Sequence, residues 1–214
     1  MRDPVDLMER RRRATRLAIE RAAVELFEEH GCGEVTAEQV AAAAGVPPST
    51  FHRYCAAPED AVTCHMALSS ADLADAVERR RGTPFLQAVQ DGVLEVLAST
   101  QAPALDMRRT IAVCLHHAPL RARWAACGRD GQHLLAEVLA GEPPGQGTAG
   151  AEVLAGVAMA ALLTAFEHWA LDGGDVVEHL ARCFAAVAPL DVPLEVRDAP
   201  PEPVDADEQR PASG

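Results

Sequence analysis

The stretch VTAEQVAAAAGVPPSTFHRY, residues 35–54, decides the fold of this chain of 214 residues. Thr36 can cap a short helix, and Gln39, three residues later, completes a capping box. Gly45 supplies the left-handed backbone conformation that ends a helix and turns the chain. The Pro-Pro pair after this turn cannot continue the first helix, but proline suits the first turn of a second helix. The stretch therefore predicts two short helices joined by a tight turn.

Two short helices joined in this way form either a helix-turn-helix, whose second helix can enter the major groove of DNA, or an αα-hairpin within a helical core. The preceding segment favours the helix-turn-helix. Between Arg13 and His30, apolar residues recur at helical spacing, at Ile19, Ala22, Ala23, Leu26 and Phe27. Gly31 ends that helix, and a run of arginines at 10–13 precedes it. The pattern predicts a group of three helices.

Residues 13–60 resemble the N-terminal domain of the tetracycline-repressor (TetR) family of transcription regulators. Residue types and spacings agree in AAVELFEEHG (22–31), VTAEQVAAAAGV (35–46), STFHRY (49–54) and the following PED (58–60). The rest of the chain agrees with the family in length and helical character. The resemblance implies a DNA-binding domain, a connecting helix that transmits ligand binding to it, and a larger domain that binds a small molecule and dimerises through its last two helices.

Four positions depart from the family pattern. His52 stands where the recognition helix usually has Tyr, and Cys55 stands where an aromatic residue usually follows Tyr54. Pro58 replaces the Lys that grips a phosphate in many members, and Pro47 replaces the Ser that often caps the recognition helix. One backbone contact is missing and one cap is weakened, which predicts weaker DNA binding but does not break the fold.

The residues at the start of the recognition helix are best placed to meet base edges. Ser49 and Thr50 can hydrogen-bond to bases, and Arg53 can read guanine or grip a phosphate. His52 and Tyr54 suit phosphate contacts, which position the domain without reading sequence. The hydroxyl of Thr36 and the backbone N–H groups beside it also suit a phosphate. The expected DNA contacts are Thr36, Pro48, Ser49, Thr50, His52, Arg53 and Tyr54.

The formal net charge of −13 argues against a protein that coats nucleic acid through general basicity. A sequence-specific regulator needs only a local basic surface, and arginines gather near the proposed helix-turn-helix at 10–13, 16, 21 and 53. The six cysteines have no disulfide-module spacing. The N-terminus lacks an apolar signal segment, and the apolar stretch 153–166 is too short to cross a membrane. We expect a cytoplasmic protein with free thiols and no membrane contact.

Beyond the helix-turn-helix, the pattern predicts helices and hence an all-α fold. The expected helices cover 59–81, 85–100, 105–117, 120–139, 151–171 and 176–187, with a Pro- and Gly-rich loop at 141–150. The expected segments are a flexible basic arm (1–12), the helix-turn-helix domain (13–58), a helical ligand-binding and dimerisation domain (59–188) and a disordered acidic tail (189–214). An equally good interpretation of residues 1–12 is a solvated run of charges that merges into the first helix.

The larger domain offers candidates for two surfaces. Large side chains could line an effector pocket between helices, although each is equally explained as core: Phe85, Met107, His116, Trp124 and Trp169. Wide apolar faces on the last two helices predict a dimer interface. Its expected residues are Leu154, Val157, Ala161, Ala165, Val177, Leu180 and Phe184. These faces could instead pack within the core of one protomer.

Other chemistry finds little support. The Cys114-Leu115-His116-His117 cluster suggests a metal, but adjacent His side chains diverge on a helix, and packing or pocket lining is the simpler interpretation. A thiol redox switch is open, although buried cysteines commonly serve as small apolar core residues. Enzyme motifs such as Glu-x-x-His, a Gly-rich phosphate loop or G-x-S-x-G are missing. We expect no catalytic residue, metal or cofactor.

The sequence thus predicts a DNA-binding transcription regulator, a small-molecule-responsive repressor that binds a pseudo-palindromic operator as a homodimer. Its expected partners are a double-stranded DNA operator, an unidentified small-molecule effector and a second copy of the chain. Two alternatives remain. One is a helical metal or thiol sensor, and the other is a protein-interaction module with weakened DNA binding.

Overall fold

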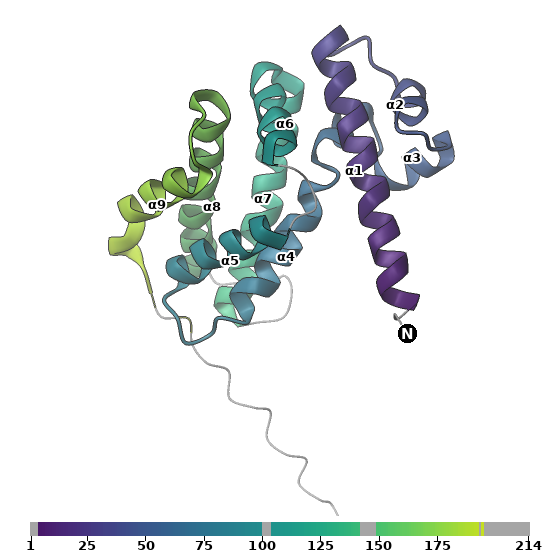
Figure 1. The fold of residues 1–214 in the computed structure, drawn as a ribbon. Coiled ribbons are helices and arrows are strands. Elements are labelled where there is room, and N and C mark those ends of the chain that lie inside the picture. Colours follow the sequence, from purple (N-terminus) through teal and green to yellow (C-terminus); the bar gives the residue numbers. More distant parts are fainter. Residues whose placement is uncertain (1–3, 100–103, 142–148, 193, 195–214) are drawn as a thin grey trace, which may run out of the picture.

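The computed structural model describes residues 4–99, 104–141, 149–192 and 194. Within these residues all regular secondary structure is helical, so the predicted all-α fold is confirmed. Figure 1 shows a small N-terminal group of helices standing beside a larger helical group, with the connection running between them.

The N-terminal group consists of α1 (Pro4–His30), α2 (Ala37–Ala43) and α3 (Pro48–Tyr54). Its core contains side chains with no exposed surface, among them Ile19, Val40 and Phe51. Removing this apolar surface from water is the main term that holds three short elements together. The predicted three-helix group is therefore present, with α3 where the sequence predicts the recognition helix.

The structure corrects the expectation for residues 1–12. Residues 4–12 belong to α1, which continues without interruption to His30, and residues 1–3 lie outside the described part. The segment is rich in Leu, Met, Glu and Arg, which are strong helix formers, so nothing in it stops the helix from extending. The alternative of a charge run that merges into the first helix is the one the structure supports.

The larger group contains α4 (Met66–Glu78), α5 (Phe85–Ser99), α6 (Ala104–His116), α7 (Ala118–Ala140), α8 (Ala149–Asp172), α9 (Val176–Val187) and the 3-10 helix η2 (Ala188–Leu190). Helix α4 packs on α5 and α7, α7 packs on α8, and α8 packs on α9. Helix α6 lies against α7 and α8 and also meets α1. Apart from α4, these helices match the ranges predicted from apolar periodicity within a few residues at each end.

The connecting helix expected over 59–81 is interrupted. A 3-10 helix, η1 (Pro58–Thr63), precedes α4, which begins only at Met66. The carboxylate of Asp60 accepts hydrogen bonds from the backbone N–H groups of Ala56 and Ala57 at 3.1 and 2.9 Å and fixes the tight turn. The side-chain Oε2 of Glu20, on α1, accepts from the N–H of His65 at 2.9 Å. The start of α4 is therefore capped by a side chain of another helix, after the 3-10 helix has ended.

The tail expected to be disordered from residue 189 is ordered at its beginning. Asp191 accepts hydrogen bonds from the N–H groups of Leu86 and Gln87 and so caps α5. Leu194 is buried and exchanges backbone hydrogen bonds with Gly82 and Thr83. Residues 193 and 195–214 lie outside the described part. The first residues of the acidic segment thus form a strap over the turn between α4 and α5.

Helix α8 also corrects an expectation. The apolar stretch was expected to be too short for a membrane, but α8 has 24 residues and contains an 18-residue window with a mean hydropathy of 1.8, which meets the length and composition of a membrane span. A buried helix in a soluble protein meets the same criteria. Here α8 packs against α6, α7 and α9, and its apolar residues form much of the core of the larger group.

Candidate functional site

The sequence signals of the helix-turn-helix are realised in the backbone. Thr36 Oγ1 accepts from the N–H of Gln39 at 3.2 Å, and Gln39 Oε1 accepts from the N–H of Thr36 at 2.7 Å, so the predicted capping box is present. Gly45 has a φ of 67°, the left-handed conformation expected at the turn. Pro48 opens α3, and Phe51 anchors the helix with a side chain that has no exposed surface.

The predicted DNA contacts lie on α3 and at the start of α2, in the part of the molecule that is remote from α8 and α9 (Figure 1). Their exposed members are Thr36, Pro48, Ser49, His52 and Arg53. Thr50 and Tyr54 are half-buried. Side chains with this exposure are available to a partner, whereas Phe51 on the opposite side of α3 is not.

Two arginines stack on Tyr54. The guanidinium carbons of Arg16 and Arg53 lie 5.2 and 5.1 Å from the centroid of the ring, which is the range of cation–π contacts. The Arg53 side chain is exposed, so stacking limits its freedom and holds its charge near the end of α3. The Nε of Arg16 is buried, and the described residues offer it no hydrogen-bond partner.

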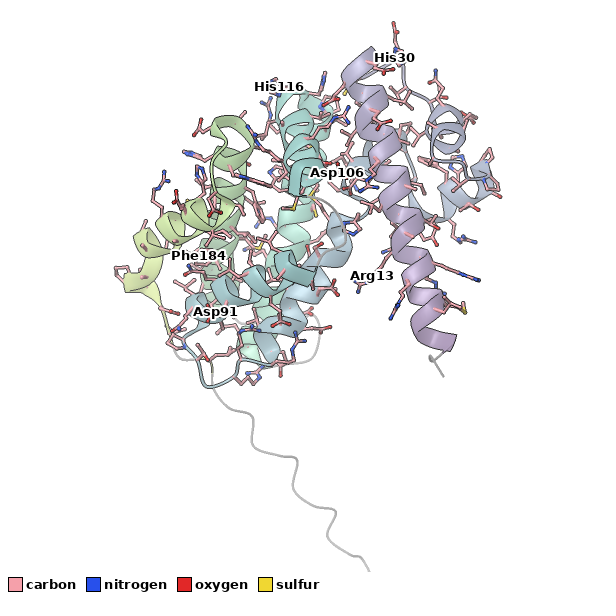
Figure 2. All side chains as sticks on the ribbon, viewed as in Figure 1. Arg13, His30, Asp91, Asp106, His116 and Phe184 are labelled. Atoms are coloured by element: carbon pink, nitrogen blue, oxygen red, sulfur yellow. The ribbon has the colours of Figure 1, made fainter. Side chains whose placement is uncertain are left out.

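Two other arginines of α1, predicted near the DNA surface, are instead paired with the larger group of helices. Arg13 donates two hydrogen bonds to Asp72 on α4, at 2.7 and 2.8 Å. Arg21 forms an ion pair with Asp106 on α6 at 2.5 Å, and Figure 2 shows Asp106 between α6 and α1. Sequence spacing placed these arginines correctly on α1 but could not tell which face α1 turns toward α4 and α6.

The same seam contains a buried carboxyl group. Glu20 is 5% exposed and accepts its backbone hydrogen bond at the start of α4. Burial raises the pKa of Glu20 from 4.5 to about 8, and the nearby charges of Arg21 and Asp106 act in opposite directions. A third contact joins Asp60 of η1 to Arg123 of α7 at 2.9 Å. Helix α1 is therefore joined to α4 and α6, and η1 is joined to α7, by polar and charged contacts.

A cavity of about 90 Å³ lies inside the larger group, enclosed by side chains of α4, α5, α6, α7 and α8. Its lining is apolar except for the hydroxyls of Ser69 and Ser70, and it contains no charged side chain among the described residues. The methionines of the lining are Met66, Met107 and Met159. Unbranched methionine side chains adapt to different shapes, so the cavity can accommodate an apolar molecule by rearranging them.

Two of the five predicted pocket residues, Met107 and Trp124, line this cavity. Phe85 instead has no exposed surface and packs in the core formed with α8 and α9. His116 is exposed near the end of α6 (Figure 2), where its Nδ1 lies 2.6 Å from the carbonyl oxygen of Ala112. Trp169 packs in the core that reaches α1 and α6, outside the lining. Large size marks a residue as buried but does not say whether it faces a space.

The indole Nε1 of Trp124 donates a hydrogen bond to Glu167 of α8 at 2.9 Å. The sequence around Glu167 gives no signal of this contact, because the two residues lie on different helices. On α7, Gly128 and Gly131 border the cavity: an added Cβ would lie 2.6 Å from Leu163 Cδ1 at the first position, so the leucine side chain would have to shift. These glycines let α7 approach α8 closely.

The cluster Cys114-Leu115-His116-His117 does not converge on a point. Cys114 is buried, His116 is exposed, and His117 stands at the N-cap of α7. Among the described residues no group of three His, Cys, Asp or Glu side chains could hold a metal ion. The residues of this motif therefore give no geometric support to the metal hypothesis.

The expected dimer residues fall into two sets. Ala161, Ala165, Leu180 and Phe184 are buried inside the protomer, against the expectation that they form an interface. Leu154 and Val157 are half-buried, and Val177 is 45% exposed. Other apolar side chains of α8 and α9 remain exposed, among them Val153, Ala160, Val177, Ala181 and Ala185. Periodicity identified apolar helices but not which face serves the core.

Comparison with known proteins gives two family matches. The description "Bacterial regulatory proteins, tetR family" matches residues 19–54, and "MftR C-terminal domain" matches residues 83–190. No curated protein matches the chain. The solved structure "SmeT-Triclosan complex" has a TM-score of 0.55 at 18% identity, over 88% of this chain and 100% of that one. FadR of Thermus thermophilus, a TetR family transcriptional repressor in complex with lauroyl-CoA, has a TM-score of 0.50 at 24% identity, over 86% and 97%.

The two matched segments coincide with the two regions described above. The first contains the capped α2, the turn and α3, and the second runs from the start of α5 to η2 and includes much of the cavity wall. Members of the matched family are regulators rather than enzymes. The sequence matches and the arrangement of helices lead to one assignment: the chain belongs to the TetR family of DNA-binding transcription regulators.

Proposed function

We propose that this protein is a small-molecule-responsive repressor that binds a pseudo-palindromic DNA operator as a homodimer. The observation that carries the proposal is the apolar cavity between α4 and α7. Two of its lining residues, Met66 and Trp124, are sequence neighbours of His65 and Arg123, which contact the DNA-binding group. Occupation of the cavity can therefore be transmitted to α3.

The first route runs through α4. Met66 lines the cavity in the first turn of α4, and the preceding His65 donates its backbone N–H to Glu20 of α1. A molecule that displaces Met66 moves the first turn of α4 and with it the contact to α1. Because α1, α2 and α3 share one core, α3 moves with α1.

The second route runs through α7. Trp124 lines the cavity, and the adjacent Arg123 pairs with Asp60 of η1. Asp60 also holds the N–H groups of Ala56 and Ala57, directly after the recognition helix. In a dimer both routes change the separation of the two recognition helices, which must match half-sites about 34–36 Å apart. An effector that favours another separation lowers operator affinity.

The lining indicates the class of effector. Without a charged side chain, the cavity would leave a charged ligand group unpaired, which is costly in an apolar interior. We infer a neutral, largely apolar molecule with a group that can hydrogen-bond to Ser69 or Ser70. Two similar structures, at under 25% identity, are complexes with triclosan and with lauroyl-CoA, which supports a small-molecule effector here.

On this proposal residues 13–58 act as the DNA-binding domain and 59–188 as the effector and dimerisation domain of a cytoplasmic protein. Bases are read by Ser49, Thr50 and Arg53, and phosphates are held by His52 and the start of α2. The homodimer forms through the exposed apolar side chains of α8 and α9 rather than through the buried residues of these helices.

The test is fluorescence anisotropy of the pure protein with duplex DNA that flanks its own gene, beside a scrambled duplex, at two salt concentrations. Selective binding that weakens as salt rises supports the proposal, because phosphate contacts release counterions. Arg53→Ala should lower operator affinity at least tenfold while folding and dimerisation stay intact. Arg129→Ala, an exposed arginine on α7, is the matched control and should bind as the unaltered protein does. Unchanged binding by Arg53→Ala would refute the placement of the recognition helix.

A further inference from the structure

Arg16, on the side of α1 that meets the end of α3, is placed differently from its neighbour Arg13. Arg13 donates two hydrogen bonds to the carboxylate of Asp72 on α4, and Figure 2 shows it on the side of α1 that faces α4. Among the described residues no carboxylate pairs with Arg16, whose guanidinium carbon lies 5.2 Å from the centroid of the Tyr54 ring. The fold thus provides Arg16 with an aromatic support but with no counterion.

The guanidinium of Arg16 is held with one edge inside the protein. Its Nε is buried and has no hydrogen-bond partner in the described part of the chain. Its two terminal nitrogens bond to none of these residues either, and they are not buried. A guanidinium has five N–H donors in one rigid plane. The donors on the terminal nitrogens of Arg16 therefore face solvent beside Tyr54, where an acceptor from outside the protein can reach them.

A second cation lies against the same ring. The guanidinium carbon of Arg53, on α3, is 5.1 Å from the centroid of Tyr54, and no described carboxylate pairs with Arg53. The ring attracts each guanidinium, but the two positive charges repel each other. An anion bound beside the ring offsets this repulsion. The end of α3 therefore favours a negatively charged partner.

The length of α3 indicates where this end lies on DNA. Seven residues of helix are about 10 Å long, close to the width of the major groove, about 12 Å. A helix of this length that lies in the groove brings its last residues to the sugar-phosphate backbone at the wall of the groove. Tyr54 is the last residue of α3. Arg16, which stacks on Tyr54, is therefore expected beside a phosphate and not beside a base.

Helix α1 continues the same basic side beyond the end of α3. It is unbroken from Pro4 to His30 and runs past α3 toward the N-terminus (Figure 1). At about 100° per residue, Arg12 lies one turn before Arg16 and only about 40° away around the helix, whereas Arg11 lies about 140° away. Arg12 and Arg11 are both exposed. Arg12 and Arg16 thus form a basic strip along one side of α1, which Arg11 does not share.

We propose that Arg12 and Arg16 bind backbone phosphates beside the bases that α3 reads, so that α1 is a second DNA-binding element. The proposal rests on the proposed DNA-binding role of α3. The terminal nitrogens of Arg16 donate two parallel hydrogen bonds to one phosphate, and the Tyr54 ring holds the guanidinium plane in position. Arg12, about 6 Å further along the axis of α1, binds another phosphate. These contacts add affinity and fix the register of α3 without reading sequence.

The dependence of DNA binding on salt tests the strip. Fluorescence anisotropy of the full-length protein is measured over a series of salt concentrations, with the duplex that flanks its own gene and with a scrambled duplex. Arg16→Gln and Arg12→Gln should each weaken binding to both duplexes by a similar factor. Each should also lower the slope of log K against log salt by about one per protomer, or about two for a dimer.

Arg11→Gln is the matched control, because it removes the same charge from an exposed position on another side of α1. Its slope should equal that of the unaltered protein. Slopes that stay unchanged in the Arg12 and Arg16 variants, or that fall equally in all three variants, overturn the proposal. If the unaltered protein does not prefer the flanking duplex, the proposed operator function fails, while the slopes on the scrambled duplex still decide the role of the strip.

A second arm separates phosphate binding from mechanical support of α3. A methylphosphonate at one position of the flanking duplex removes the charge of a single phosphate. A scan of positions should find one at which the unaltered protein loses affinity and Arg16→Gln loses no more. Arg12→Gln should show the same insensitivity at a different position. If every methylphosphonate weakens the Arg16 variant as much as it weakens the unaltered protein, Arg16 only supports Tyr54 and the proposal is wrong.

Discussion

The seam between helices α1–α3 and the larger group differs from the interior around α8, because it adds charged contacts to its apolar packing. The seam contains the ion pairs of Arg13, Arg21 and Asp60 with partners across it, together with the buried Glu20. The interior around α8 is built from apolar side chains, and its cavity has no charged residue in its described lining. Apolar packing holds both regions together, and the charged contacts give the seam a further contribution whose strength depends on pH and salt.

The largest expected effect is in the apolar interior. Phe85 is fully buried among residues of α5, α8 and α9, so Phe85→Ala removes a large apolar side chain and leaves a cavity. We expect the free energy of unfolding to fall by about 3–5 kcal/mol. Urea titration measures the loss. Leu7→Ala, at a 50% exposed position on α1, is the control and should change stability by less than about 0.5 kcal/mol. Equal losses for both variants would contradict the assignment of Phe85 to the core.

The next effect is at the seam and depends on pH. The pKa of Glu20 is raised from 4.5 to about 8 in the folded protein, so the folded state holds a proton that the unfolded state releases above pH 4.5. Below pH 4.5 both states hold the proton, and the stabilisation from the protonated Glu20 is fully present. Between pH 4.5 and 8 the free energy of unfolding falls by roughly 1 kcal/mol per pH unit. Glu20→Gln keeps an oxygen that can accept from His65 but cannot titrate.

Urea titrations of the two proteins between pH 5 and pH 8 check this prediction. The difference between their unfolding free energies should change steadily in favour of Glu20→Gln as pH rises. Taking the difference removes contributions shared by both proteins, including that of His65, whose pKa is lowered by burial. Parallel pH profiles would show that Glu20 is not buried as a neutral carboxyl group.

The smallest effect is expected from an exposed ion pair of the seam. Arg109 of α6 bonds to Glu28 of α1, and each side chain is more than a third exposed, at 47% and 35%. Arg109→Gln should lower the free energy of unfolding by less than about 1 kcal/mol, because exposed pairs are screened by water and salt. A double-mutant cycle with Glu28→Gln at low and high salt isolates the pair. A coupling energy that does not change at high salt would show instead that this pair is shielded from solvent, like the buried interior.

Local signals were sufficient for the recognition unit. The capping box at Thr36 and Gln39 and the left-handed Gly45 depend on residues close in sequence, so the sequence predicted them together with the boundaries of α2 and α3. Apolar periodicity predicted the helices of the larger group for the same reason. The break before α4 was missed because Glu20, the residue that caps it, lies 45 positions away.

The site residues of the larger group were predicted less well, because a helical pattern says which residues are apolar but not what they face. Ala161 and Leu180 fill the protomer's own core, while the less conspicuous Ala181 and Ala185 stay exposed. Met107 and Trp124 reach the cavity, and Phe85 does not. The burial of Glu20 likewise results from tertiary packing, for which the sequence has no local signal.

The strap formed by Asp191 and Leu194 has a consequence for shortened or tagged versions of the chain. A protein cut after Leu190 would lose the carboxylate that caps α5 and the buried leucine that bonds to Gly82 and Thr83. The hairpin of α4 and α5 would then be open at one end, next to the helix that walls the cavity. A cut, or an affinity tag attached, after Leu194 leaves this fastening in place and is the safer boundary for crystallisation.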